Sequence, residues 1–449
     1  MYPFFLACVL LSPLPFGANR PWAWSLFAVL FGLLGFIFCI QVFLGKRQLH
    51  LNFRGALSAF ILWCIPIAWA MFQASDLAPT RWTHPFWPLA SEQLPNTVQA
   101  HISVDPQQTW TALMRLISYA VVFALSLQFN RDSDKAALTF KSIAYAGFAY
   151  ALYGVINDLG KFDTILWFDK WVGQGLVTST FVNRNSYATY AGLTFLASMP
   201  LLFDLFHSSL KFGLTSNYGR QYFYNNVFIR GWFPLLLAIT IISALIMSES
   251  RGGFLSTTLG LLSLLIILLV SHKINKKTGL LTLVGLIAII SWVVLERSFD
   301  ILMGRFDALD IESEGRALVY DLVAKASFEN RWLGMGYGNF DHSFRLYRDE
   351  SIVGFYDKAH NTYLENIFEL GWLQASALFL SIIWLALICL RGVWVRQRNW
   401  LYPALGFAAS ILVGVHAFMD FSLQIPAVAY TYALILGAGV AQSFPTRRG

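Results

Sequence analysis

The sequence is dominated by apolar stretches that are long enough to cross a lipid bilayer. A transmembrane helix needs about 20 mostly apolar residues to span about 30 Å of hydrocarbon. By that criterion the chain has about twelve candidate spans. They lie at residues 2–17, 22–44, 55–74, 109–129, 136–157, 185–205, 232–248, 253–271, 279–296, 360–390, 401–421 and 426–443.

The composition supports this interpretation. Of the 449 residues, 57% are hydrophobic and 13% are charged, whereas about 25% of an ordinary soluble protein is charged. Disordered chains are poor in aromatic residues, but 16% of these residues are aromatic. Four cysteines in the whole chain do not make a disulfide scaffold. We therefore expect an all-α polytopic membrane protein with about twelve transmembrane helices.

The distribution of basic residues indicates the orientation of the bundle, because lysines and arginines in short loops stay on the cytoplasmic side. With both termini inside, seventeen of them lie in or beside the cytoplasmic segments and six lie in the short outer loops. The cytoplasmic segments are 45–54, 130–135, 206–231, 272–278, 391–400 and the C-terminal tail. Only three of the 25 acidic residues lie on this side. The sequence therefore predicts cytoplasmic termini and chemistry on the outer face, and the net charge of +7 reflects topology and not nucleic-acid binding.

The predicted spans divide the chain into three regions. These are spans one to nine at 1–296, an outer loop at 297–358, and spans ten to twelve at 359–449. The loop is too long to be a simple connection. Within it, residues 316–330 carry Leu318, Leu322 and Ala326 at helical spacing. We expect an amphipathic helix on the membrane surface or against the bundle, with Ser313 as its N-cap.

A tight turn at 248–252 joins two spans on the outer face and places Arg251 at the start of the second one. The first N–H groups of a helix are unpaired and the helix dipole is positive there, so a helix N-terminus attracts anions. A basic residue at that point is locally unfavourable unless an anion is bound. Gly252 and Gly253 would let a head group approach the backbone. The alternatives are that Arg251 snorkels to lipid phosphates or pairs with Glu249.

Arg316 repeats this pattern in the first turn of the expected loop helix. Guanidinium groups bind phosphate oxygens in a bidentate manner. Two such arginines on one side of the membrane therefore indicate a diphosphate clamp. The alternative is a salt bridge to a neighbouring acid, Asp310, Glu312 or Glu314.

His360 lies where the outer loop re-enters the membrane. A histidine titrates near neutral pH and can act as a general base, although a single interfacial histidine is more often structural. A base beside a diphosphate site would have an evident task. On a continuous helix Asn361, Glu365 and Glu369 share one face, so Glu365 orients His360 only if the helix begins after the histidine.

Weaker signals lie on the same face. Arg184 opens span six and is a candidate third phosphate contact. His416 and Asp420 are four residues apart on a helix and are expected to form a structural pair. A glycine-rich stretch at 334–338 follows no strand and is interpreted as a turn. The only Asp-x-Asp spacing, at 132–134, lies on the cytoplasmic side, so we expect neither a metal site nor another cofactor.

These motifs together resemble the O-antigen ligase and O-antigen polymerase superfamily of bacterial envelope enzymes. The matching stretches are Ser250-Arg251-Gly252-Gly253, Gly315-Arg316 with Leu333-Gly334-Met335-Gly336-Tyr337-Gly338, His360-Asn361-Thr362-Tyr363-Leu364 with Glu369-Leu370-Gly371, Phe181-Val182-Asn183-Arg184-Asn185 and the opening Pro13-Leu14-Pro15-Phe16-Gly17. The specific motifs cover about residues 180–375, and the rest matches only as a multi-span bundle.

The resemblance implies a metal-independent glycosyltransferase of the bacterial inner membrane that acts at the periplasmic face. Such an enzyme moves a glycan from undecaprenyl diphosphate to a sugar hydroxyl. By position, Arg251 and Arg316 would hold the diphosphate and His360 would be the catalytic histidine. Direct displacement predicts inversion at the anomeric carbon. Asn361, Glu365 and Glu249 are candidates for a supporting role around these groups.

The acceptor and the partners stay open at this point. A ligase would transfer the glycan to a lipid A-core oligosaccharide, and a polymerase would join it to another lipid-linked repeat. Envelope polysaccharide assembly proteins are candidate partners besides the membrane lipids. A transporter or flippase for a lipid-linked glycan is the alternative from another class, but such folds often carry inverted repeats, and none is evident in the sequence.

Overall fold

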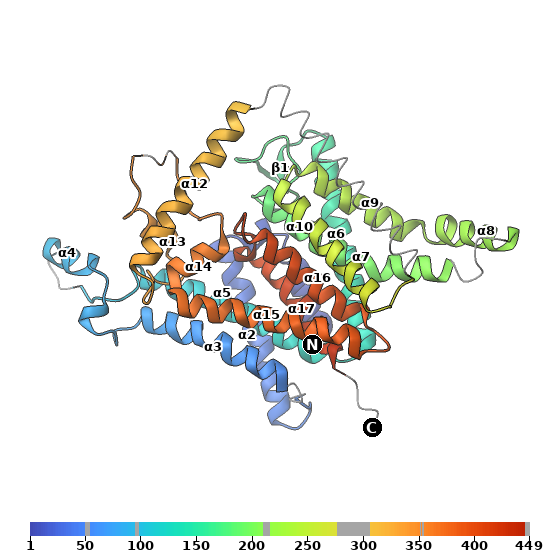
Figure 1. Cartoon of the computed structure of the whole chain (residues 1–449), viewed down its shortest axis with the longest axis horizontal. Helices are drawn as coiled ribbons and strands as arrows, with labels where there is room; N and C mark the ends of the chain where they lie inside the picture. The colour runs from blue at the N-terminus through green and yellow to red at the C-terminus, as the bar shows by residue number, and fades with distance from the viewer. Residues whose placement is uncertain are drawn as a thin grey trace.

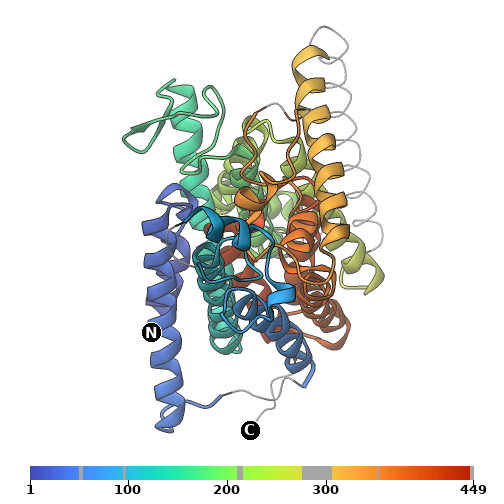
Figure 2. The same ribbon diagram turned by 90° about the vertical axis from the view of Figure 1, so that its left-hand side faces the viewer.

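The computed structural model describes residues 1–49, 54–94, 98–209, 216–275, 306–350, 352 and 354–444. Its secondary structure is almost entirely helical (Figure 1). The two strands in this part of the chain, β1 Thr164–Ile165 and β2 Phe168–Asp169, form one short antiparallel pair. The helices pack side by side into a bundle, with α12 rising at one end of it (Figure 2). The prediction of an all-α protein is confirmed.

Six helices in the described residues are long and apolar enough to cross a membrane. They are α2 Pro21–Phe43, α3 Arg54–Gln73, α5 Pro106–Phe129, α7 Arg184–Ser209, α10 Arg251–Val270 and α15 Trp372–Val395. A seventh candidate consists of two segments that meet at an angle of 61°. The first segment, 217–230, contains α8 Asn217–Tyr224 and η3 Asn225–Arg230, and the second is α9 Trp232–Met247. The total of twelve spans stays a prediction.

Other helices fill most of the remaining predicted spans or lie between them. They are α1 Tyr2–Leu11, α4 Phe86–Gln93, α6 Ser133–Leu159, α12 Phe306–Glu329, α13 Phe340–Phe344, α14 Thr362–Leu370, α16 Leu401–His416 and α17 Pro426–Ser443, with short turns η1 Phe16–Ala18, η2 Thr80–Trp82 and η4 Ser422–Gln424. The predicted span at 279–296 lies outside the described residues. Helix α1 is shorter than its predicted span because Pro13 and Pro15 cannot continue a helix.

The centre of the bundle is α17, in which every residue is buried. It packs against α5, α7, α15 and α16. Small residues allow this close approach: a Cβ atom added at Gly437 would lie 2.8 Å from the carbonyl oxygen of Phe123 on α5. Tight packing of backbones over small residues is the usual way in which membrane helices associate, because lipid provides no hydrophobic driving force between them.

The prediction of one continuous helix at 360–390 is wrong. The segment forms two helices, α14 and α15, which are separated at Gly371 with φ +84°. This left-handed conformation favours glycine, and a Cβ atom at Gly371 would lie 2.8 Å from the carbonyl oxygen of Trp332. The segment after α12 therefore packs into the break, where Trp372 N donates to Arg331 O.

The prediction that the loop helix begins at Ser313 is also wrong. Helix α12 begins at Phe306, so Arg316 lies in its interior and not in its first turn. The preceding residues include good helix formers such as Ala308, Leu309 and Glu312. Continuous helix propensity therefore outweighs the local capping signal of Ser313. The amphipathic character is confirmed, since Val319, Val323 and Ala326 are buried against α13 and α14.

Helix α16 also ends earlier than its predicted span, at His416 instead of residue 421. The residues that follow form a turn into α17, in which Ala417 N and Phe418 N still donate to carbonyls of α16. This turn lies at the same end of the bundle as the start of α14, because Thr362 N donates to Ala417 O over 2.8 Å. We refer to this end as the site end.

The close contact between α17 and α5 makes Gly437 a test of the fold. Gly437→Ala places a Cβ atom 2.7 Å from Ser126 Cβ, and we expect it to destabilise the protein by about 1–3 kcal/mol, as overpacking does. The measurement is the thermal midpoint of the protein in detergent. Gly32→Ala is the matched control, since a Cβ atom at Gly32 meets nothing within 4 Å. Equal midpoints for the two variants would contradict the tight α5–α17 contact.

Candidate active site

His360 lies immediately before α14, in a left-handed backbone conformation with φ +53°. The helix begins at Thr362, and Asn361 caps it by accepting a hydrogen bond from Leu364 N over 3.0 Å. The helix therefore begins after the histidine, which is the condition for Glu365 to support His360. Left-handed non-glycine residues are uncommon and gather at functional sites.

Glu365 is buried and supports the backbone next to His360. Its carboxylate accepts hydrogen bonds from Ala359 N at 2.9 Å and from Lys358 Nζ at 3.2 Å. The groups that it holds are thus the two residues before the histidine. We infer that Glu365 positions the segment that carries His360, without touching the imidazole.

The carboxylate that lies beside the imidazole belongs to Asp420, in the turn after α16. His360 Nδ1 and Asp420 Oδ1 are 3.7 Å apart, and the ring of Phe421 packs edge-on against the imidazole at 5.0 Å. Burial raises the pKa of Asp420, but the interactions with His360, His416 and the Phe421 N–H lower it more, so the net pKa lies below its usual range. An ionised Asp420 favours a proton on Nδ1 and leaves Nε2 as the acceptor, which is the arrangement of a general base.

The expected pair of His416 and Asp420 is present as a backbone hydrogen bond, in which Asp420 N donates to His416 O over 3.0 Å, together with an electrostatic interaction between the two side chains. His416 Nδ1 lies 3.1 Å from Thr189 Oγ1 of α7, in a hydrogen bond whose direction depends on the tautomer. The described residues show no ion pair between His416 and Asp420. The backbone of Asp420 stays one turn beyond His416, and its carboxylate faces His360 at the start of α14.

Arg184 and Arg251 occupy the first positions of α7 and α10, as predicted. Asn183 caps α7 by accepting from Asn185 N at 2.7 Å, and Ser250 caps α10 by accepting from Gly253 N at 3.1 Å. Ser250 Oγ also donates to Asn185 Oδ1 over 2.8 Å, so the two helix starts lie side by side. Two positive helix ends, each with an arginine, form an anion-binding arrangement.

The two glycines after Arg251 lie in helix contacts, and the approach of a head group to them stays a prediction. A Cβ atom at Gly253 would lie 2.4 Å from Ala188 Cβ, and one at Gly252 would lie 3.3 Å from His416 Nε2. The same contacts place the start of α10 against the end of α16. Among the described residues no ion pair joins Arg251 to Glu249, which is exposed and has φ +52°.

Arg316 approaches the site from α12. It lies one helical turn before Tyr320, whose hydroxyl donates to the carbonyl oxygen of His360 over 2.8 Å. Burial raises the pKa of Tyr320, and the nearby charges of Arg316 and Asp420 act on it in opposite directions. A Cβ atom at Gly315 would lie 2.6 Å from Tyr356 Oη, so α12 packs closely over this segment.

Glu369 has a different role from Glu365. It is buried and accepts from Phe340 N at 2.9 Å. The backbone of the glycine-rich stretch at 334–338 wraps around the end of α14, where Gly336 N donates to Glu369 O. The interpretation of this stretch as a turn is confirmed, and Glu369 supports that turn.

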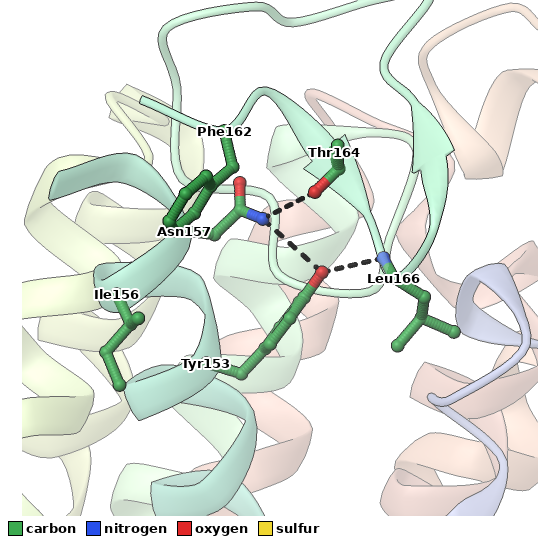
Figure 3. Close-up of a pocket in the computed structure, with 6 residues that line it drawn as sticks. All are labelled: Tyr153, Ile156, Asn157, Phe162, Thr164 and Leu166. Carbon is green, nitrogen blue, oxygen red and sulfur yellow. Dashed lines mark hydrogen bonds between the residues drawn. The ribbon is translucent and has the colours of Figure 1, made fainter. Parts of the chain in front are cut away.

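The segment between α6 and α7 leads directly into Arg184. The end of α6 holds it through Tyr153, whose hydroxyl accepts from Leu166 N at 2.6 Å, and through Asn157, whose amide donates to Thr164 Oγ1 at 2.9 Å (Figure 3). These residues line a cavity of about 370 Å³. Further along, Val177 N donates to Met247 O at the end of α9, which fixes the segment beside the α9–α10 turn.

Sequence reasoning missed the proximity of Asp420 and Tyr320 to His360. Asp420 gave one signal, namely a carboxylate among apolar residues at the outer end of a span. Its partner could not be identified, because the two residues are sixty positions apart. In the described part of the chain, no three His, Cys, Asp or Glu side chains are grouped closely enough to hold a metal ion.

The described residues form a helical protein with several helices of membrane-spanning length, and His360, Asp420, Arg184 and Arg251 lie at one end of its bundle. Residues 236–379 match the family model for O-antigen ligase. The match confirms the resemblance to the O-antigen ligase and polymerase superfamily and indicates a membrane glycosyltransferase of that type. It includes Arg251, Arg316 and His360, but Arg184 and Asp420 lie outside it. No curated protein matches the chain.

Comparison of the Lys358–Glu365 and Arg345–Asp341 ion pairs tests whether Glu365 stabilises the segment that carries His360. Glu365→Gln removes the negative charge that pairs with Lys358 in a buried position. We expect the free energy of unfolding to fall by about 1–3 kcal/mol. The measurement is thermal unfolding, together with limited proteolysis around residues 354–361. Asp341→Asn is the control, because the Asp341–Arg345 pair is largely exposed and such pairs contribute about 0–1 kcal/mol. Equal losses of stability in Glu365→Gln and Asp341→Asn would contradict the positioning role of Glu365.

Proposed function

We propose that this protein transfers a glycan from undecaprenyl diphosphate to a sugar hydroxyl, at the site end of the bundle. The observation that carries the proposal is a histidine beside a buried carboxylate, joined through α16 to two helix starts that each begin with an arginine. The match to the O-antigen ligase family supports the class of reaction.

His360 acts as the base in this proposal. Nε2 takes the proton of the acceptor hydroxyl while the hydroxyl oxygen forms a bond to the anomeric carbon. The bond from that carbon to the diphosphate oxygen breaks, and its electron pair leaves with the diphosphate. Asp420 stabilises the imidazolium that forms. A single displacement inverts the anomeric configuration, and a retained configuration would exclude it.

The diphosphate is bound at the starts of α7 and α10. Arg251 and Arg184 supply guanidinium groups there, and the two helix ends add their N–H groups and dipoles. Arg316 adds a third positive charge from α12. Arg316 lies one turn before Tyr320 in the interior of α12, so its positive charge reaches the site without a contribution from a helix N-terminus. Preorganised charge of this kind stabilises the leaving group as the bond breaks.

Three further residues hold this arrangement in the proposal. Asn361 caps α14, and Glu365 fixes the backbone before His360. Glu249 occupies the strained turn that allows α10 to begin directly after α9. We expect all three to act through position, without contact to substrate.

We propose the ligase reaction, with a lipid A-core oligosaccharide as acceptor. Polymerisation of lipid-linked repeats is the alternative, since the same base and diphosphate site would serve both. The proposed setting is the bacterial inner membrane, with cytoplasmic termini and a periplasmic site. A loss-of-function strain distinguishes the two reactions. Lipid-linked polymer without surface attachment indicates a ligase, whereas accumulated single repeats indicate a polymerase.

The direct test is transfer by purified protein. The protein is incubated with a defined undecaprenyl-diphosphate glycan and with each candidate acceptor, and the products are analysed by mass. Formation of a new glycosidic bond with release of undecaprenyl diphosphate supports the proposal. Movement of the lipid-linked glycan across a vesicle without any new bond would indicate transport instead.

The arginines at the helix starts give one prediction for this assay. Arg251→Ala is expected to lower kcat by about 10²–10³-fold, the usual effect of removing one preorganised donor. Arg184→Ala is expected to act in the same direction. Arg345→Ala, which removes an exposed arginine of the loop before α14, is the control. Near-normal transfer by both site variants would exclude the anion site at α7 and α10.

Asp420 gives a second prediction. Asp420→Asn keeps the size of the side chain but removes the charge beside His360 Nδ1, so we expect kcat to fall at least about 10²-fold. The apparent KM for the donor should change little, because Asp420 does not contact the diphosphate in this proposal. Asp357→Asn alters an exposed acid three residues before His360 and serves as control. A change in KM with unchanged kcat would contradict the role of Asp420.

A further inference from the structure

A cationic pocket lies at the end of the bundle opposite the site. It has a volume of about 370 Å³ and lies between the end of α2, the end of α5 and the start of α6. The residues that line it include Arg47, Arg131, Asp132 and Lys135. The charge distribution of the sequence predicts that this end faces the cytoplasm.

Arg47 is held in a defined position in this pocket. Its guanidinium carbon lies 5.5 Å from the ring centre of Phe129 and 6.0 Å from that of Phe38. Its Nε donates to Gln41 Oε1 over 2.6 Å. A snorkelling arginine extends toward water, whereas Arg47 lies back over two rings of the bundle, so little conformational freedom is left to lose when an anion binds.

The charge of the pocket is unbalanced. Asp132 pairs with Lys135 at 3.4 Å and is the only acid in the lining, which also holds Arg47 and Arg131. Arg131 NH1 donates to Phe444 O at 3.0 Å, so its guanidinium is anchored at the end of α17. The formal charge of these four side chains is therefore positive, and the pocket suits a ligand with a negative charge.

An exposed apolar strip on α2 flanks Gln41, the residue that holds Arg47 in the pocket. Ile37 is 44% exposed and Leu44 is 56% exposed. They lie four residues before and three residues after Gln41, so they share its side of the helix. A cationic pocket above an apolar strip matches a ligand that joins an anionic head to hydrocarbon chains.

We propose that this pocket binds the phosphate of an anionic phospholipid, with the acyl chains along the strip on α2. Basic pockets between transmembrane helices on the cytoplasmic side bind anionic lipid head groups in this way. Arg47 and Lys135 contact the phosphate, and Arg131 adds charge from behind. The site is separate from the proposed glycan transfer and does not depend on it.

The test is native mass spectrometry of the intact protein in detergent with added phosphatidylglycerol or phosphatidylcholine. Arg47→Gln combined with Lys135→Gln is expected to weaken phosphatidylglycerol binding at least tenfold. Lys46→Gln combined with Lys141→Gln removes the same charge from two exposed lysines outside the pocket, and binding should stay within twofold. Lys135→Gln alone, at a half-exposed position, gives the readout if the double variant does not fold.

Three results would overturn the proposal. Equal losses in the pocket and control variants would mean that the lipid only senses net charge. Equal binding of phosphatidylcholine would remove the requirement for an anionic lipid. Inorganic phosphate that displaces the lipid at millimolar concentration would indicate a site for a soluble anion instead.

Discussion

The candidate site depends on the contact between the start of α14 and the turn that follows α16. Thr362 donates two hydrogen bonds there, from its backbone N to Ala417 O and from its hydroxyl to Asp420 O. Buried polar groups without partners cost about 1–3 kcal/mol each, so these bonds fix one register between the two segments. That register brings the imidazole of His360 beside the carboxylate of Asp420.

Strain and support occur together around this contact. His360 and Glu249 both have left-handed backbone conformations, which cost about 1–3 kcal/mol each for residues other than glycine. Each one lies directly before a capped helix start: Asn361 caps α14 and Ser250 caps α10. The hydrogen bonds of the two caps and of the buried Glu365 stabilise these strained backbone conformations. A short, rigid turn places a side chain more accurately than a long loop would.

The two ends of the bundle use cations in different ways. At the site end, Arg184 and Arg251 stand at helix starts, where the helix dipole adds to their charge. At the opposite end, Arg47 lies over aromatic rings and Arg131 binds carbonyl groups at the end of α17. In the proposed function, the first arrangement presents donors to an anion that approaches from water. The second one lies beside exposed apolar surface, where lipid is the neighbouring phase.

The sequence by itself determined the helical class, the position of most apolar helices and the places where Arg184 and Arg251 begin theirs. These features depend on composition, on runs of apolar residues and on local capping groups, which act within a few residues. The break at Gly371, the start of α12 and the partner of His360 were decided by tertiary structure. Gly371 is required by the backbone of Trp332, and Asp420 meets His360 only because α16 ends at His416 and α14 packs on the turn beyond it. Contacts between residues so far apart in the chain leave no periodic signal in the sequence, so packing alone establishes them.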